Sequence, residues 1–330
     1  MRIGIVGVTG FGGSELLRLI AGHPHFELVW VGGESSAGVP LSKRFPALAS
    51  RPEGGLTIER FEPQALPAID LLFASLPTGG SRQPLAQVAP QIRIVDVGGD
   101  HRFTEDWVYG LTELAQQRAA IASARRVANP GCYPVAAVLA LAPLLQHGLI
   151  EPDGIVVDAK SGVTGTGRGG ASGFGFAETN EDLFAYGLAG HPHVPELRNA
   201  LALAAGGPVS LAFTPHLVPM NRGLLATCYA RPRGRIDAAM LADAARATYR
   251  DAAFVQVVEP ENGRGPRTGW ATASNYAFVS YAFDADCGQV IACGAIDNLG
   301  KGAAGQAVQN ANLMCGFPET AGLTGLPARP

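Results

Sequence analysis

The sequence predicts an α/β protein of two domains, in which a doubly wound parallel sheet comes first and an α+β domain with a mixed sheet follows. Short apolar runs alternate with helical patterns up to about residue 130, and longer strand-like segments follow from about residue 150. The chain has 330 residues, which is more than a single core usually organises. These three observations carry the prediction.

The first domain is predicted from four apolar runs rich in Val, Ile and Leu, the first of them followed by a helical pattern. Runs of this kind are typical of parallel strands buried on both faces, because the helices of βαβ units cover both sides of the sheet. The runs are RIGIVGV (2–8), FELVWVGG (26–33), IDLLFASLP (69–77) and IRIVDVGG (92–99).

The second domain is predicted from longer segments with the character of mixed or antiparallel strands. They are IVVDAKSGV (155–163), VSLAFTPHLVPM (209–220), GLLATCYARP (223–232), NYAFVSYAFD (275–284) and QVIACGAID (289–297). A helical tail at 300–315 is expected to pack back on the first domain. We therefore divide the chain into a dinucleotide-binding domain of residues 1–131 with 299–330, and a catalytic and oligomerisation domain of residues 132–298.

Composition excludes several classes of partner. The net charge is −3 without a basic block, which argues against nucleic acid and anionic membranes. We find no apolar run as long as the roughly 18 residues of a membrane span, and no secretory signal in MRIGIVGVTG, so we expect a cytoplasmic protein with a small-molecule partner. The five cysteines are scattered without a CxxC pair, so neither disulfides nor a metal site is expected.

A glycine-rich turn follows the first apolar run and opens a helix, in the pattern GxxGxxG. Glycines let the backbone turn tightly beside a pyrophosphate, and the helix N-terminus offers N–H groups and a partial positive charge. The pattern at this place predicts the dinucleotide site of a Rossmann-type domain. The residues expected to contact the cofactor here are Gly7, Thr9, Gly10, Phe11, Gly12 and Gly13.

The choice between NAD and NADP is left open by the end of the second run. Glu34 stands about 20 residues beyond the last glycine, where a carboxylate binds the adenosine ribose of NAD. Ser35 and Ser36 could instead donate to the 2′-phosphate of NADP, with Lys43 or Arg44 as countercharge.

The candidate nucleophile is Cys132, in the segment NPGCYP (129–134) before an apolar helical stretch. Gly131 permits a sharp turn and Pro134 suits a first helical turn, so Cys132 is expected where the N–H groups and dipole of a helix stabilise a thiolate. The same N–H groups could hold the oxyanion of a tetrahedral intermediate.

A proton-transfer group is predicted in GHPHVPE (190–196), which we expect to be a proline-braced loop ahead of a helix at 196–205. Histidine titrates near neutral pH, so His191 or His193 can take the thiol proton, and the residues alone do not say which. Glu196 lies beside them. A metal site at the two histidines is not favoured, because no third ligand is evident from the spacing.

Taken together, the motifs resemble those of the N-acetyl-γ-glutamyl-phosphate reductase family of arginine biosynthesis, relatives of aspartate-semialdehyde dehydrogenase. The resemblance spans nearly the whole chain in the family's order. Its motifs are GxxGxxG from residue 7, NPGCYP from 129, SGVTGTGR from 161, GHPHVPEL from 190, FTPHLVPMNRG from 213 and DNLGKGAAGQAVQNANLM from 297.

This resemblance implies NADP as cofactor, although Glu34 leaves NAD open, and a homodimer or homotetramer. It implies Cys132 as nucleophile and His193 as its acid/base partner, supported by His191 and Glu196. Substrate contacts are expected at Arg102, Asn129 and Arg168, and further cofactor contacts at Thr78, Gly162 and Asn298. The chain departs from the family's usual residues at Glu34 (arginine), Thr78 (histidine) and Val135 (threonine), and matches it loosely at 266–275.

The reaction implied is reduction of an acyl phosphate through a cysteine thioester, which accepts hydride more readily than an ester or an acid. One alternative is a relative acting on a carrier-linked acyl phosphate one methylene longer, as in lysine biosynthesis. Arg168 is the only charged residue from 164 to 177, which favours a free substrate over an acidic carrier protein. Another alternative is a dinucleotide-binding redox sensor without catalysis.

Overall fold

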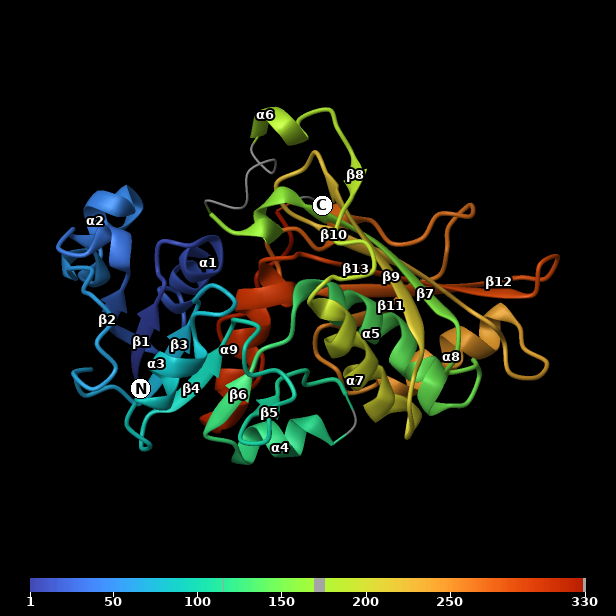
Figure 1. Cartoon of the computed structure of the whole chain (residues 1–330), viewed down its shortest axis with the longest axis horizontal. Helices are drawn as coiled ribbons and strands as arrows, with labels where there is room; N and C mark the ends of the chain where they lie inside the picture. The colour runs from blue at the N-terminus through green and yellow to red at the C-terminus, as the bar shows by residue number, and fades with distance from the viewer. Residues whose placement is uncertain (115, 169–175, 329–330) are drawn as a thin grey trace. The chain divides into compact units, whose positions relative to one another are not determined.

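The computed structural model describes residues 1–114, 116–168 and 176–328. These residues form two compact units, shown in Figure 1. Unit 1 comprises Met1–Thr112, Gln117–Pro130 and Ala303–Thr324, and unit 2 comprises Glu113–Gln116, Gly131–Gly302 and the segment from Gly325. Each unit is built around one sheet.

Unit 1 contains a six-stranded sheet in the order β2-β1-β3-β4-β6-β5, and every pairing in it is parallel. The strands are β1 (Arg2–Val6), β2 (Glu27–Gly32), β3 (Leu71–Ala74), β4 (Arg93–Asp96), β5 (Val108–Tyr109) and β6 (Arg126–Ala128). Its helices are α1 (Phe11–Ile20), α2 (Leu41–Arg44), α3 (Arg82–Ala86), α4 (Gln117–Ser123) and α9 (Gly305–Met314), with short 3₁₀ turns at Glu34–Ser36, Pro46–Leu48 and Pro52–Gly55.

The central strands of unit 1 are buried on both faces. All four residues of β3 are fully buried, as are Ile3 and Ile5 on β1. Two-sided burial explains why these strands show continuous apolar runs rather than alternation. The doubly wound parallel sheet predicted from the sequence is confirmed.

Unit 2 contains a seven-stranded mixed sheet in the order β11-β12-β13-β10-β7-β9-β8. The β7–β9 and β11–β12 pairs are parallel and the others are antiparallel. The strands are β7 (Ile155–Gly162), β8 (Phe184–Ala185), β9 (Leu211–Val218), β10 (Leu224–Ala230), β11 (Val255–Val257), β12 (Ala277–Asp284) and β13 (Gln289–Ile296). The α+β domain with a mixed sheet is thereby confirmed.

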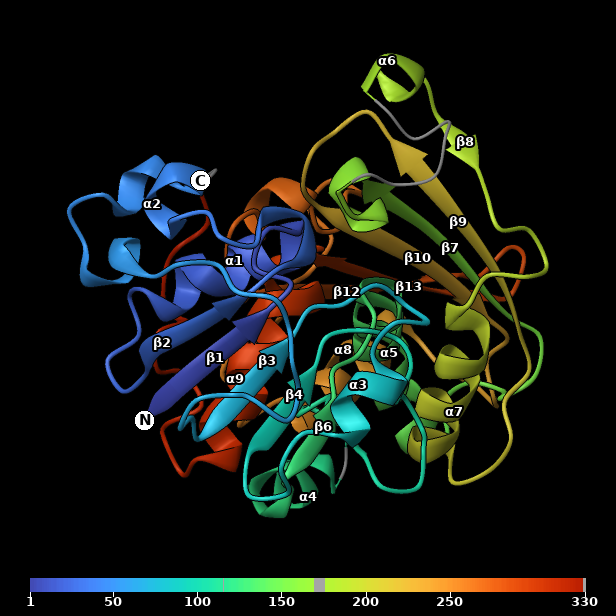
Figure 2. The ribbon, with the colours of Figure 1, turned by 60° about the vertical axis from the view of Figure 1, so that its left-hand side comes forward.

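Helices cover one face of this sheet (Figure 2). They are α5 (Cys132–Gln146), α7 (His193–Ala205) and α8 (Ala238–Thr248), and the short α6 (Phe176–Thr179) lies apart from them. Residues 133–145 of α5 are buried all round, as expected for a helix in the middle of a core. A Cβ at Gly294 of β13 would lie 2.3 Å from the Ala136 carbonyl oxygen, so glycine is what allows α5 to approach β13 so closely.

The helix predicted at 196–205 starts earlier than expected, because α7 begins at His193. Pro195 is tolerated in its first turn, where backbone N–H groups lack intrahelical acceptors. His193 and Glu196 are therefore set on a helix rather than on a loop. Among the described helices, none combines the length and the apolar character that crossing a membrane requires.

Candidate active site

The glycine turn of unit 1 is packed so tightly that side chains are excluded. Gly7 has φ +79°, and a Cβ there would lie 2.1 Å from the Ser75 carbonyl oxygen. A Cβ at Gly13 would lie 2.0 Å from the Gly7 carbonyl oxygen. Helix α1 begins directly after Gly10, which offers no side-chain cap to its first N–H groups. A glycine turn that leads directly into a helix N-terminus fits the pyrophosphate of a dinucleotide.

The other predicted cofactor residues of unit 1 lie on exposed segments. Glu34 and Ser35 are exposed at the end of β2 and Ser36 is half-buried. The Glu34 carboxylate accepts a hydrogen bond of 3.3 Å from the Phe61 N–H. A Cβ at Gly33 would lie 3.8 Å from Thr9 Oγ1, which places Thr9 beside the end of β2. Thr78 is exposed after β3.

Two of the predicted substrate residues, also in unit 1, are held by hydrogen bonds. Arg102 donates from Nε to the Asn129 carbonyl oxygen at 3.0 Å. Asn129 is fully buried, and its amide donates to the Ala303 carbonyl oxygen at 3.0 Å and accepts from Asn310 Nδ2 at 3.0 Å. Helix α9 thus holds Asn129, three residues before Cys132, through Asn310, and Arg102 is hydrogen-bonded to the same asparagine.

Cys132 is the first residue of α5 and is half-buried. Its predecessor Gly131 is the N-cap, with extended dihedrals and no side-chain cap. The dipole of this 15-residue helix stabilises negative charge at its N-terminus, which includes a thiolate at Cys132.

Glu196 reaches the same turn from the first turn of α7. It is buried, and its Oε1 accepts a hydrogen bond of 2.8 Å from the Gly131 N–H. A carboxylate in a first helical turn is itself favoured by the helix dipole. Through this bond Glu196 holds the backbone that carries the sulfur atom.

His191 and His193 lie in an aromatic cluster with Tyr133, the neighbour of Cys132. Their ring centroids are 5.8 Å and 5.9 Å from that of Tyr133 and 4.8 Å from each other. The His193 N–H donates to His191 Nδ1 at 3.1 Å, so this nitrogen carries no proton. Burial lowers the pKa of His191 to about 4, which leaves it neutral at physiological pH.

The tyrosines of this cluster, which the sequence analysis passed over, are hydrogen-bonded in series. Tyr186 donates to the Tyr133 hydroxyl at 3.2 Å, and Tyr133 donates to the His216 carbonyl oxygen at 3.0 Å. Burial raises the pKa of Tyr186 to about 12, and it raises the pKa of Tyr133 further; the charge of Cys132 contributes to both. Both phenols stay protonated. In the sequence, the position of Tyr133 directly after Cys132 in NPGCYP was the feature that could have indicated its place in the site.

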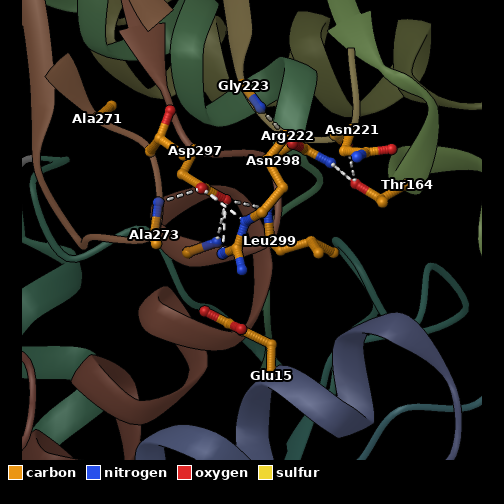
Figure 3. Close-up of polar contacts among 12 residues, drawn as sticks. Glu15, Thr164, Asn221, Arg222, Gly223, Ala271, Ala273, Asp297, Asn298 and Leu299 are labelled. Carbon is orange, nitrogen blue, oxygen red and sulfur yellow. Dashed lines mark hydrogen bonds and ion pairs between the residues drawn. The ribbon is translucent and has the colours of Figure 1, made fainter. Parts of the chain in front are cut away.

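The remaining predicted residues belong to unit 2. Gly162 ends β7, and Arg168 is exposed beyond it; residues 169–175 of the glycine-rich segment lie outside the described residues. Asn298 is buried, accepting from the Gly223 N–H at 2.8 Å and donating to Thr164 Oγ1 at 2.9 Å (Figure 3). Its amide therefore joins two loops of unit 2.

Unit 2 thus brings together Cys132, both histidines and Glu196, whereas the glycine turn, Arg102 and Asn129 belong to unit 1. Comparison with known proteins follows the same division. Residues 2–124 match the model of the semialdehyde dehydrogenase NAD-binding domain, and residues 132–298 match that of its dimerisation domain. The N-terminal match identifies a nicotinamide-dinucleotide-binding domain.

Solved structures support the fold alone. Aspartate semialdehyde dehydrogenase from Candida albicans, crystallised with NADP, has a TM-score of 0.75 at 16% identity, covering 95% of this chain and 98% of that one. The Vibrio cholerae aspartate semialdehyde dehydrogenase II has a TM-score of 0.73 at 17% identity, with the same coverage.

Curated relatives are much more similar in sequence. N-acetyl-gamma-glutamyl-phosphate reductase from Bradyrhizobium sp. (strain BTAi1 / ATCC BAA-1182) is 56% identical over 100% of this chain and 99% of its own. The protein of the same name from Salinispora arenicola (strain CNS-205) is 45% identical over 98% of both chains. This chain belongs to the N-acetyl-γ-glutamyl-phosphate reductase family.

Proposed function

We propose that this enzyme reduces N-acetyl-γ-glutamyl phosphate to N-acetylglutamate 5-semialdehyde and phosphate, with NADPH as reductant, in arginine biosynthesis. The observation that carries the proposal is the setting of Cys132. It begins a buried helix, its backbone is held by Glu196, and two histidines stand beside the next residue. A half-buried sulfur so placed suits covalent catalysis better than core packing.

The chain's own residues account for the covalent steps. The Cys132 thiolate attacks the γ-carbonyl carbon, a C–S bond forms, and the C–O bond to phosphate breaks as phosphate leaves. First-turn N–H groups of α5 face the oxyanion. After reduction of the thioester, His193 protonates the new oxyanion to give a neutral hemithioacetal. It takes the hydroxyl proton back as the C–S bond breaks, so that the aldehyde forms and the Cys132 thiolate is regenerated.

The dinucleotide is assigned to the glycine turn and the start of α1, and when bound it supplies the hydride. Arg102 and Arg168 are proposed to bind the carboxylate and phosphate of the substrate, since a guanidinium suits both groups. Asn129 and Asn298 have their amides engaged within the protein. We therefore assign them to holding the backbone around these groups.

The test is the reaction in reverse. Protein is incubated with N-acetylglutamate semialdehyde, phosphate and either NADP or NAD, and absorbance of the reduced cofactor is followed. We expect phosphate-dependent reduction. No reduction of either cofactor would refute the proposal. Cofactor reduction only with a semialdehyde attached to a carrier protein would instead identify the carrier-linked compound as the substrate.

Glu34 is proposed to set the cofactor preference. Its exposed carboxylate stands at the end of β2, where it repels a 2′-phosphate, so NADP binds less tightly than it could and NAD is accepted. Glu34→Gln should lower the KM for NADP by roughly tenfold, which corresponds to about 1.4 kcal/mol, and change the KM for NAD much less. Glu27→Gln, at the exposed start of β2, is the matched control. Equal changes for both cofactors would exclude this role.

The open face of the seven-stranded sheet is proposed as the surface where a second copy packs to form a homodimer. Strands β7, β9 and β10 alternate buried residues, facing the helices, with half-exposed ones on the other side. The half-exposed set includes Val156, at 38% exposure, and an ion pair of Asp158 and Lys160, with His216 Nδ1 3.1 Å from the Asp158 carboxylate. An apolar surface with paired charges suits a self-complementary interface.

Thr227 stands on β10, the middle strand of that sheet, and is half-exposed. Thr227→Arg would place a long, charged side chain in this surface, where a second copy would have to bury it, so the dimer dissociation constant should rise by at least roughly tenfold. Ala247→Arg, exposed on α8, is the control and should leave assembly unchanged. Analytical ultracentrifugation measures both. A Thr227→Arg protein that dimerises like the wild type would place the interface elsewhere.

A further inference from the structure

The Asp297 carboxylate, just beyond β13, is buried and collects five hydrogen bonds (Figure 3). Arg222 donates to it from Nε at 2.8 Å and from Nη2 at 3.0 Å. Backbone N–H groups of Ala273, Leu299 and Gly300 donate to it at 2.5, 2.8 and 2.8 Å. A buried charge with this many donors is well satisfied, and removing one partner from such a pair is costly.

These bonds fix the start of a π-helical turn, Gly300–Ala304. The carbonyl oxygen of Asp297 adds a further bond, accepted from the Gly302 N–H at 2.9 Å. Turns of π type are found frequently at functional sites. Here the first residues of the turn are hydrogen-bonded to Asp297, both to its buried carboxylate and to its backbone carbonyl oxygen.

The turn lies against the nucleophile. A Cβ at Gly302 would be 2.8 Å from Cys132 Cβ and 3.1 Å from the Asp297 carbonyl oxygen. Gly302 therefore lies between the Asp297 carbonyl oxygen and Cys132 Cβ, and the Ile296 side chain approaches the same position, 3.1 Å from where a Gly302 Cβ would be. A shift of this turn would therefore change the packing against Cys132 and displace its sulfur atom.

The loops after β7 and β9 are hydrogen-bonded to each other and to Asn298, the residue after Asp297. Arg222 follows β9, and its neighbour Gly223 donates to Asn298, whose amide in turn donates to Thr164 Oγ1. Thr164 donates from its hydroxyl to the Asn221 carbonyl oxygen at 2.6 Å. The loops after β7 and β9 are thus cross-linked by the residues next to Asp297.

We propose that Arg222 and Asp297 are positioning residues for Cys132. The Asp297 carboxylate holds the π-helical turn against the nucleophile, and Arg222 both orients that carboxylate and offsets its negative charge close to a sulfur that must ionise. The inference rests on the proposed function for the role of Cys132. The inference adds that the position of the sulfur atom depends on the ion pair of Arg222 and Asp297, which lies outside the cluster of Tyr133 and the two histidines.

The test compares Arg222→Met, Arg222→Lys and Asp297→Asn with the wild type. A displacement of about 1 Å costs roughly 100-fold in rate, so kcat should fall by about that factor in Arg222→Met and Asp297→Asn. The KM for semialdehyde and the Kd for cofactor should stay within about threefold. Arg222→Lys keeps the positive charge but loses the paired hydrogen bonds of the guanidinium, so it should retain more kcat than Arg222→Met. Arg246→Met, which removes two exposed ion pairs, to Asp243 and Glu259, is the control.

A second measurement does not require turnover. Iodoacetamide modification of Cys132, followed by mass spectrometry of its peptide, should slow in parallel with kcat. Gly302→Ala, which leaves the ion pair of Arg222 and Asp297 in place but pushes on Cys132, should show the same loss. Wild-type kcat and alkylation in Gly302→Ala, or in folded Arg222→Met, would overturn the inference. Inactive wild-type protein would instead refute the proposed function, and the alkylation rates would still test the positioning.

Discussion

Cys132→Ala should abolish phosphate-dependent reduction of the cofactor, with a loss of roughly 10⁴-fold or more in kcat. Without the sulfur, neither the thioester nor the hemithioacetal can form, and direct hydride transfer to an acyl phosphate lacks the covalent capture that divides the reaction into two easier steps. The dinucleotide is assigned to the glycine turn of unit 1, so its Kd should change by no more than a few fold. Fluorescence titration of the reduced cofactor measures that Kd.

Cys293 supplies a matched control for this substitution. It is also half-buried, but it lies on β13 rather than at a helix N-terminus, and burial raises the pKa of its thiol. Cys293→Ala should retain wild-type kcat. Cys132→Ser separates loss of the atom from loss of its nucleophilicity, and we expect it to be nearly as inactive as Cys132→Ala. Appreciable reductase activity in Cys132→Ala would assign the nucleophile elsewhere.

Local sequence patterns predicted the features that depend on local structure. Apolar runs located β1 to β4 of the first sheet and the long strands of the second, but not the short strands β5, β6, β8 and β11. Gly131 with Pro134 located the start of α5, because turn and helix-start preferences are set within a few residues. The same reasoning placed His193 in a loop. It failed there because Pro195, usually a helix breaker, is tolerated in a first turn.

Contacts between distant segments could not be predicted in this way. Glu196 was expected beside the histidines, but nothing in the sequence indicated that it would accept a hydrogen bond from the Gly131 N–H, 65 residues away. Asp297 was not singled out at all, because an aspartate after a strand resembles any turn residue until Arg222, 75 residues earlier, is seen to pair with it. Backbone groups carry no sequence signal as partners, so these bonds appear only in the folded chain.

The two histidines also show what the fold adds to the sequence, which gave no local reason to choose between them. His191 accepts a hydrogen bond at Nδ1 and has its pKa lowered by burial to about 4. General bases work best with a pKa near the operating pH, so His191 is a poor proton acceptor at neutral pH. This supports His193 as the group that moves protons.

The lowered pKa of His191 also makes the stability of the fold depend on pH. Because its folded-state pKa lies below the ordinary value of 6.5, the unfolded chain binds more protons between these two values. Stability from this group is therefore present above about pH 6.5 and is lost as pH falls toward 4. His191→Asn keeps an acceptor near the Nδ1 position and cannot titrate, so it should lose this part of the acid sensitivity in thermal denaturation.

His193→Asn should lower kcat by roughly 10²- to 10⁴-fold, the usual contribution of a general acid/base, whereas His191→Asn should cost less than about tenfold. An acid limb of kcat/KM near neutral pH should persist in His191→Asn, since a group with a pKa near 4 does not titrate there. It should disappear in His193→Asn. If the acid limb is lost instead in His191→Asn, the proton passes through His191, and the burial that lowers its pKa must be relieved when substrate binds.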